Sequence, residues 1–177
     1  MLVIHPADTS TDFLQALYDG QEGIRLLRGN ESRNQVNDIL FHLPPREPVM
    51  LLGHGSDAGL FRKQDGAYSL YIGRSMAYCL RKHPVIGIWC HAYLFAEQLR
   101  LHGLFSGMIV SEMDEAREYA MKTSEDELER ENQLFATNLA SLLRAGIPIP
   151  EIPGEMRALI QDGPEVRDFN YRSLSII

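Results

Sequence analysis

Two short apolar segments, each followed by a chemically reactive residue, constrain the fold of this chain more than any other feature. The first covers residues 48–52 and leads to His54, and the second covers residues 84–89 and leads to Cys90. A continuous apolar run of this length is typical of an interior strand in a parallel sheet covered on both faces. Ligands and reactive groups collect at the carboxyl ends of such strands. The pattern therefore predicts an α/β fold with a histidine and a cysteine at the carboxyl edge of its sheet.

The composition fits one folded domain and excludes several function classes. The 177 residues are enough for one sizeable core, and we predict a single domain over residues 1–177 with a helical extension from about residue 124. The formal net charge of −7, without a basic stripe, argues against nucleic acid as a partner. No apolar run is long enough to cross a membrane, and residues 1–6 are expected to begin the first strand rather than form a signal peptide. The two cysteines form neither a disulfide framework nor a metal-binding spacing, so a reducing cytoplasm is the expected compartment.

Strands and helices are predicted to alternate along the chain. Apolar runs predict strands at residues 2–5, 23–27, 49–52, 85–89 and 108–110. Capping signals and amphipathic spacing predict helices that begin near residues 9, 32, 74, 91, 113, 124 and 154. This alternation predicts a three-layer α/β/α sandwich with a mostly parallel sheet and right-handed crossovers. Residues 169–177 show no pattern that assigns them to a helix or a strand.

The stretch from Gly59 to Tyr71 lacks the continuous apolar character of the predicted core strands, and it predicts a β-hairpin outside the main sheet. Polar and apolar residues mix on both sides of Asp65-Gly66, a dipeptide that supplies the positive φ of a tight turn. Because the hairpin follows His54 directly, we expect it to lie beside the same edge of the sheet.

Cys90, His54 and Gly55 are the candidate catalytic residues. Cys90 stands where a helix is predicted to begin, and the free N–H groups of a first helical turn favour a thiolate. A thiol nucleophile needs an acid/base partner, and His54 is placed to be that partner. Gly55 lets the backbone approach a ligand closely, so its N–H group can point at a substrate carbonyl. Cys90 as a small buried apolar residue and His54 as part of a simple tight turn remain the structural alternatives.

With these residues the sequence resembles the caspase-like cysteine peptidases of clan CD, which include caspases, gingipains, legumain, separase and bacterial CHAT-type domains. The resemblance rests on the segment Val-Met-Leu-Leu-Gly-His-Gly at 49–55, the segment Val-Ile-Gly-Ile-Trp-Cys at 85–90 and the hairpin signal between them. It covers about residues 2–119, including a strand expected at 107–111. It implies a caspase-like topology and a cysteine endopeptidase that acts on a peptide or protein substrate without a cofactor or a metal.

The resemblance also implies a role for each candidate residue. Cys90 is the expected nucleophile, and His54 is expected to protonate the leaving amine. The N–H groups of Gly55 and Cys90 are expected to form the oxyanion hole. In this family the thiol and the imidazole face each other across the scissile bond and need not touch in the free enzyme.

Further residues are expected to bind the substrate at the same edge. The loop at Ser111, Glu112 and Asp114 corresponds to a region that lines the S1 pocket in relatives, and two carboxylates there suit a basic side chain. Alternatively, the two carboxylates cap the next helix. His5 ends the first strand, so it is expected to line the cleft, and His91 directly follows the nucleophile.

Two other interpretations stay open at this stage. The Cys-His pair at 90–91 is also similar to PfpI-like enzymes of the amidotransferase-related group, which have an Ile-Cys-His-Gly stretch and in which His91 would contribute to the site. The other interpretation is a non-catalytic domain that keeps the fold and binds a partner through its cleft or a helical face. Neither the substrate nor the oligomeric state follows from the sequence.

Overall fold

A six-stranded sheet forms the centre of the computed structural model, which describes residues 1–177. Five strands are parallel, and the sixth, at one edge, is antiparallel to its neighbour. The strand order is β2 (Arg25–Leu27), β1 (Leu2–Ile4), β3 (Val49–Leu52), β7 (Pro84–Ile88), β8 (His102–Ser106) and β9 (Leu174–Ile176). The predicted mixed α/β fold with a mostly parallel sheet is thereby confirmed.

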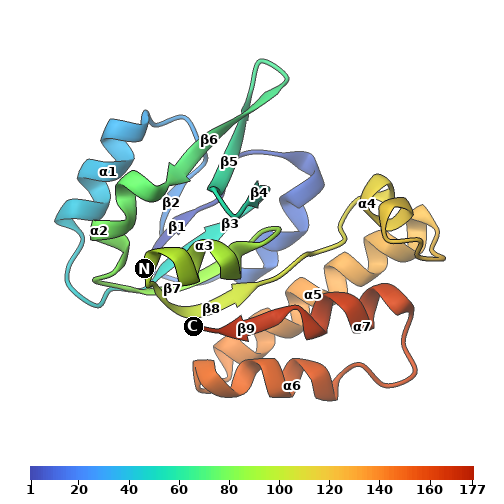
Figure 1. The fold of residues 1–177 in the computed structure, drawn as a ribbon. Helices are drawn as coiled ribbons and strands as arrows, with labels where there is room; N and C mark the ends of the chain where they lie inside the picture. Colours follow the sequence, from blue (N-terminus) through green and yellow to red (C-terminus); the bar gives the residue numbers. More distant parts are fainter.

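Helices cover both faces of this sheet (Figure 1). One face carries α1 (Arg33–His42), α2 (Ala77–Leu80) and α3 (Ala92–Leu99), with the short 3-10 helix η2 (Arg74–Met76) leading into α2. The other face carries the 3-10 helix η1 (Thr9–Leu17), α5 (Glu125–Arg144), η3 (Ile149–Glu151), α6 (Ile152–Ala158) and α7 (Glu165–Arg172). The short helix α4 (Met113–Glu118) lies beyond the carboxyl edge of the strands.

The central strands are apolar along their whole length because each side chain packs into one of two cores. Successive side chains of a strand point to opposite faces. The core beneath α1 and α3 therefore receives Leu2, Ile4, Val49 and Leu51, and the core beneath η1 and α5 receives Val3, Met50 and Leu52. All seven side chains are at most 1% exposed. An apolar-to-polar change on either face would leave a polar group unpaired in a core.

The hairpin after His54 lies outside the main sheet, as predicted. Strands β5 (Gly59–Gln64) and β6 (Ala67–Gly73) pair with each other, and the short strand β4 (Gly55–Ser56) pairs with β5. Asp65 and Gly66 both have positive φ, at 52° and 79°, which is the backbone of a tight hairpin turn. In Figure 1 this three-stranded unit projects above the main sheet.

The predicted strand at 108–110 is wrong. The parallel strand that follows α3 is β8, at His102–Ser106, which ends before these residues. Helix α3 ends early, since Arg100 takes a left-handed conformation with φ 54°, and the chain enters β8 within two residues. Gly103 makes this pairing possible, since a side chain there would collide with the backbone of Val85 on β7. Residues 108–110 form a loop whose Val110 is held by the side chain of Asn170 rather than by a strand.

Residues 124–177 are more than a helical extension. The unassigned segment 169–177 contains the end of α7 and strand β9, which pairs antiparallel with β8 from Leu104 to Ser106. This part of the chain therefore completes the sheet as well as covering one face. The pairing was hidden in the sequence because a three-residue edge strand carries almost no periodic signal.

Of the three helix starts predicted from capping signals, two follow the prediction. Ser32 and Gln35 form the predicted capping box of α1, and Ser124 accepts the backbone N–H of Glu127 at the start of α5. The first helical segment is instead capped by Asp8, whose carboxylate accepts the N–H of Ser10, and it is a 3-10 helix. None of the helices has both the length and the apolar character that a membrane span requires.

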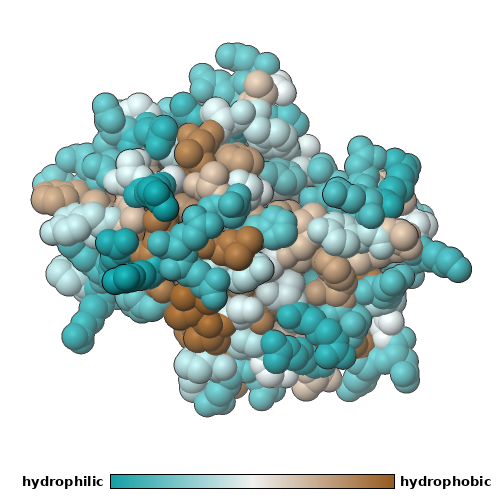
Figure 2. Space-filling model, viewed as in Figure 1, coloured by the Kyte–Doolittle hydropathy of each residue, from teal (hydrophilic) through white to brown (hydrophobic).

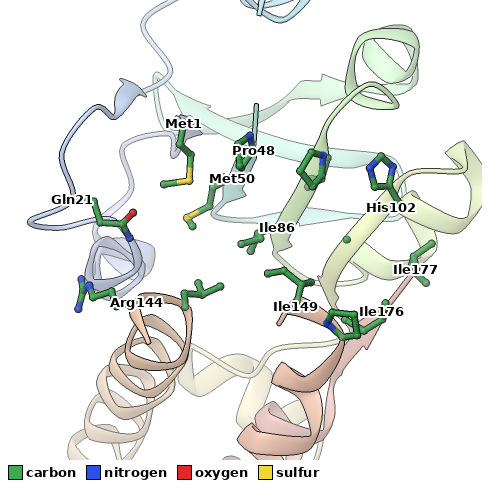
Figure 3. A pocket seen from close by; sticks show the side chains of 15 residues that line it. Met1, Gln21, Pro48, Met50, Ile86, His102, Arg144, Ile149, Ile176 and Ile177 are labelled. Atoms are coloured by element: carbon green, nitrogen blue, oxygen red, sulfur yellow. The ribbon is translucent and has the colours of Figure 1, made fainter. Parts of the chain in front are cut away.

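The amino edge of the sheet holds an apolar pocket of about 500 Å³. Met50 and Ile86 line its inner wall, and Met1 and Ile149 lie around it (Figure 3). Leu143 also lines the pocket. Apolar side chains also gather on the surface beside the end of β9, where Ile176 is 40% exposed (Figure 2). Because the pocket includes the first residues of β7 and β8, it lies at the end of the sheet opposite to His54 and Cys90.

Candidate active site

His54 and Cys90 lie at the carboxyl ends of two adjacent parallel strands. In the register between β3 and β7, Leu52 pairs with Ile88, so each reactive residue follows its last paired residue by two positions. Both residues line one small cavity of about 10 Å³, which has room for about one water molecule. The placement of the pair at one edge of the sheet agrees with the prediction, although a cavity this small is not an open cleft.

Local backbone features set the direction of each residue. Gly53, with φ 137°, bends the chain after β3 while its N–H still bonds to the carbonyl of Ile88. On the other strand, Trp89 is buried and its indole N–H donates to the carbonyl of Ser56, which ties β7 to β4. His91 then takes a left-handed conformation, with φ 67°, at the N-cap of α3. Cys90 therefore lies in a sharp turn between strand and helix.

His54 belongs to a chain of hydrogen bonds that ends at a carboxylate. Its Nε2 atom is 2.7 Å from Ser10 Oγ, and that oxygen is 3.1 Å from Asp8 Oδ1. The single hydroxyl proton of Ser10 serves only one partner. If Ser10 donates to Asp8, His54 Nε2–H donates to Ser10, and the imidazole is oriented by Asp8 through the hydroxyl. Tyr68 from β6 also donates to Asp8, at 2.7 Å, and its ring packs edge-on against His54.

Asp8 is electrostatically suited to this role. Burial by itself would raise the pKa of its carboxyl group, but hydrogen bonds from Tyr68 and Ser10 and the nearby His54 outweigh burial and lower the pKa. Asp8 is therefore ionised at neutral pH and able to accept the hydrogen bond of Ser10, which contacts His54.

The thiol of Cys90 faces two acceptors and no cation. Its Sγ atom is 3.4 Å from the carbonyl oxygen of Ile109 and 3.7 Å from Glu115 Oε1. Burial and, next, the negative charge of Glu115 raise the pKa of the thiol to about 12. In this conformation Cys90 is a protonated hydrogen-bond donor, contrary to the thiolate expected from the helix start.

The two N–H groups expected to form an oxyanion hole have no strong partners in the fold. The N–H of Cys90 makes no hydrogen bond within the chain. In the pairing of β4 with β5, Gly55 lies opposite Leu60, and the neighbouring Phe61 N–H bonds to the His54 carbonyl. Gly55 is therefore a non-hydrogen-bonded position of this pair, and its N–H does not bond to β5. A side chain at Gly55 would collide with the Trp89 indole and the carbonyl of Gly59, so only glycine fits.

The predicted substrate-binding residues are only partly brought together. Ser111 and Glu112 line a polar groove of about 610 Å³ that also includes Ser10 and carries the carboxylates of Asp12, Glu125 and Glu129. Asp114 does not line this groove; it is exposed and pairs with Arg117 on its own helix at 2.6 Å. Glu112 is the N-cap of α4, the structural alternative considered for it.

Two further expected residues occupy different environments. His91 is half-buried, its backbone N–H bonds to the Gly107 carbonyl, and its side chain makes no hydrogen bond. His5 is 0% exposed and does not line the cavity, contrary to expectation. Its ring nitrogens lie 3.0 Å from Tyr18 Oη and 3.2 Å from Thr11 Oγ1, so it organises the core beneath η1 rather than a binding surface.

Acid pH is expected to destabilise the fold through His5. Burial and, next, the positive charge of Arg28 lower the pKa of His5 from 6.5 to about 4. The folded state therefore holds neutral His5, while the unfolded chain binds a proton below its own pKa. Stability should fall as the pH drops from about 6.5 to 4, by roughly 3 kcal/mol at most for this group.

Urea unfolding at pH 7, 5.5 and 4.5 measures this loss, and the variant His5→Gln supplies the control. The variant should be less stable at pH 7 but should lose less stability with acid than the wild type. His83 also has a pKa lowered by burial, so the difference between the two proteins, rather than the total loss, is diagnostic. Identical pH dependence in both proteins would rule His5 out as the source.

Sequence reasoning missed the residues that surround the pair. Asp8, Ser10 and Tyr68 on the histidine side and Glu115 on the cysteine side have no recognisable motif. Asp8 and Ser10 follow the first strand directly, and β1 neighbours β3, so their position after a central strand was a usable signal. Glu115 and Tyr68 reach the site only through the packing of α4 and the hairpin.

No three histidine, cysteine, aspartate or glutamate side chains are grouped to hold a metal ion. A comparison of the sequence with protein-family models and with curated proteins gives no match.

Proposed function

We propose that this protein is a cysteine hydrolase of the caspase-like type that acts on peptide bonds. The observation that carries the proposal is the shared position of His54 and Cys90, two residues beyond paired positions on adjacent parallel strands and on one cavity. The adjacency of β3 and β7 and the hairpin after His54 support a caspase-like topology. The two free cysteines suit a reducing, cytoplasmic location.

The proposed chemistry assigns one task to each group. The Cys90 thiol gives its proton to His54, the sulfur attacks the carbonyl carbon of the peptide bond, and the N–H groups of Cys90 and Gly55 bind the developing oxyanion. Protonated His54 gives its proton to the leaving amine as the C–N bond breaks. Water then attacks the thioester, releases the acid product and returns the thiol. Asp8 acts through Ser10 and keeps the imidazole oriented.

The polar groove beside the pair supports a preference for basic substrates. Its lining carries four carboxylates and no lysine or arginine, and it shares Ser10 with the histidine network and Ser111 with the small cavity. A cationic side chain of a bound peptide would be attracted to this surface. Sequences with an acidic residue next to the scissile bond would be repelled.

A panel of fluorogenic peptides with basic, acidic and neutral residues before the scissile bond tests the function. Hydrolysis should require a reducing agent, stop after treatment with iodoacetamide and be fastest for arginine or lysine. Absence of hydrolysis across the panel would contradict the proposal.

A non-catalytic binding domain is the second candidate, and one observation favours it. Cys90 is protonated and half-buried against two acceptors, and the cavity beside it is too small for a substrate carbonyl and its flanking groups. Wild-type protein that neither turns over peptides nor reacts with thiol reagents at Cys90 would support this candidate.

A further inference from the structure

The side chain of Glu115 has one oxygen fixed by donors and the other turned to the Cys90 thiol. Its Oε2 atom accepts the N–H groups of Ser111, at 2.7 Å, and Glu112, at 3.1 Å, and the hydroxyl of Ser111, at 3.1 Å. Its Oε1 atom lies 3.7 Å from Cys90 Sγ. The three donors hold the carboxylate in place, so its position against the sulfur follows from the loop geometry.

The loop that carries this contact is anchored on two helices. Asn170 of α7 holds Val110 from both sides, since its amide accepts the Val110 N–H at 2.8 Å and donates to the Val110 carbonyl at 2.9 Å. Asn132 of α5 donates to the carbonyl of Ser111 at 2.9 Å. Asn170 and Asn132 are 1% and 6% exposed, so these are interior contacts rather than surface ones. Glu115 therefore remains beside Cys90 unless this loop is displaced.

The negative charges around Cys90 all favour the protonated thiol over the thiolate. Glu115 lies beside the sulfur, Glu112 adds a weaker effect of negative charge, and the Ile109 carbonyl adds a partial negative charge. His54 lies across the cavity, but its Nε2 is committed to Ser10. A thiolate formed in this place would meet two acceptors and gain no hydrogen bond, so the thiol is the favoured form.

From this arrangement we infer that Glu115 is a positioning residue that keeps Cys90 protonated and restrains its reactivity, and that release from Glu115 is what activates the thiol. Within the proposed hydrolase, on which the functional meaning of the restraint rests, the sulfur must leave this contact before it attacks a substrate. Neutralising Glu115 should produce the released state without moving the loop, because the amide oxygen of a glutamine can still accept the Ser111 N–H.

The test is the rate at which iodoacetamide labels Cys90 at pH 8, read for each cysteine by peptide mass spectrometry. Glu115→Gln removes the charge and keeps the size, and we expect labelling about tenfold faster or more, since each unit of pKa lost gives tenfold more thiolate. Glu115→Asp keeps the negative charge near the sulfur but shortens the side chain, so it should accelerate labelling less than Glu115→Gln does. Glu118→Gln, on an exposed residue of the same helix, should label at the wild-type rate. Cys79, 3% exposed, should stay unlabelled and so report that each variant is folded.

Two results would overturn the inference. Equal rates in Glu115→Gln, Glu118→Gln and the wild type would show that Glu115 does not control the thiol. A larger acceleration in Glu115→Asp than in Glu115→Gln would show that the side chain only covers the sulfur. Labelling does not require a peptide substrate, so Glu115 control of Cys90 can be found in a protein that hydrolyses nothing. Conversely, a protein that hydrolyses peptides but whose labelling rate does not depend on Glu115 would contradict the restraint by Glu115 and would still agree with the proposed function.

Discussion

Replacing Cys90 with alanine is expected to abolish peptide hydrolysis while leaving the fold intact. Under the proposed mechanism the change removes the sulfur that forms the acyl intermediate, and the remaining groups can only bind substrate and polarise its carbonyl. For nucleophiles of this kind the loss of kcat is roughly a thousandfold or more. His54→Ala should also lower kcat, by about a hundredfold or more, because no other side chain on the cavity is placed to protonate the leaving amine. Both effects are measured as kcat with the best peptide of the reporter panel.

His91→Ala is the matched control for His54→Ala. His91 is next to Cys90 in sequence, but it caps α3 and its side chain makes no hydrogen bond, so its loss should leave kcat within about threefold of the wild type. Loss of activity in His91→Ala together with full activity in His54→Ala would reverse the roles of the two histidines. That result would favour the PfpI-like interpretation over the caspase-like one.

The sequence predicted the interior strands of the sheet better than it predicted the elements around them. The interior strands could be found because each is buried on both faces and therefore reads as an unbroken apolar run, as at 49–52 and 84–88. Adjacency of β3 and β7 then placed His54 and Cys90 at one edge. Strand β8 was missed because it begins with the polar His102 and with Gly103, which has no side chain. The strand was predicted instead at the apolar run 108–110.

The electrostatic state of the candidate site could not be read from local sequence. A cysteine at the start of a helix suggests a thiolate, yet Cys90 faces Glu115, a residue 25 positions away that arrives with α4. In the same way, His54 is oriented by Asp8, which is brought near by the pairing of β1 with β3. Local patterns therefore placed His54 and Cys90 at one edge of the sheet, whereas tertiary packing determined the partners of both residues.

The C-terminal helix α7 links fold stability to this site, and an ion pair to a buried glutamate holds it. Arg167 of α7 donates to both carboxylate oxygens of Glu131 on α5, at 2.8 and 3.0 Å, and Glu131 is 1% exposed. The same helix carries Asn170, which anchors the loop over Cys90. Losing the contact between α7 and α5 should therefore weaken both the fold and the cover on the thiol.

Arg167→Met is expected to destabilise the protein by about 3 kcal/mol or more, because it leaves the Glu131 carboxylate buried without its bidentate partner. Arg130, at 3.7 Å from Glu131 and 58% exposed, can compensate only in part. Arg172→Met is the matched control on the same helix. It breaks an exposed pair with Asp168 and should cost no more than about 0.5 kcal/mol. Urea unfolding followed by circular dichroism measures both changes.

The double variant Glu131→Leu with Arg167→Met identifies the cause of the loss. If the loss in Arg167→Met arises from an uncompensated buried charge, removing the carboxylate as well should restore much of the stability, since apolar replacement of a buried pair is often neutral. If the loss arises from missing packing of the arginine stem, the double variant should be no more stable than the single one. An Arg167→Met variant as stable as Arg172→Met would show that the ion pair does not hold α7 in place.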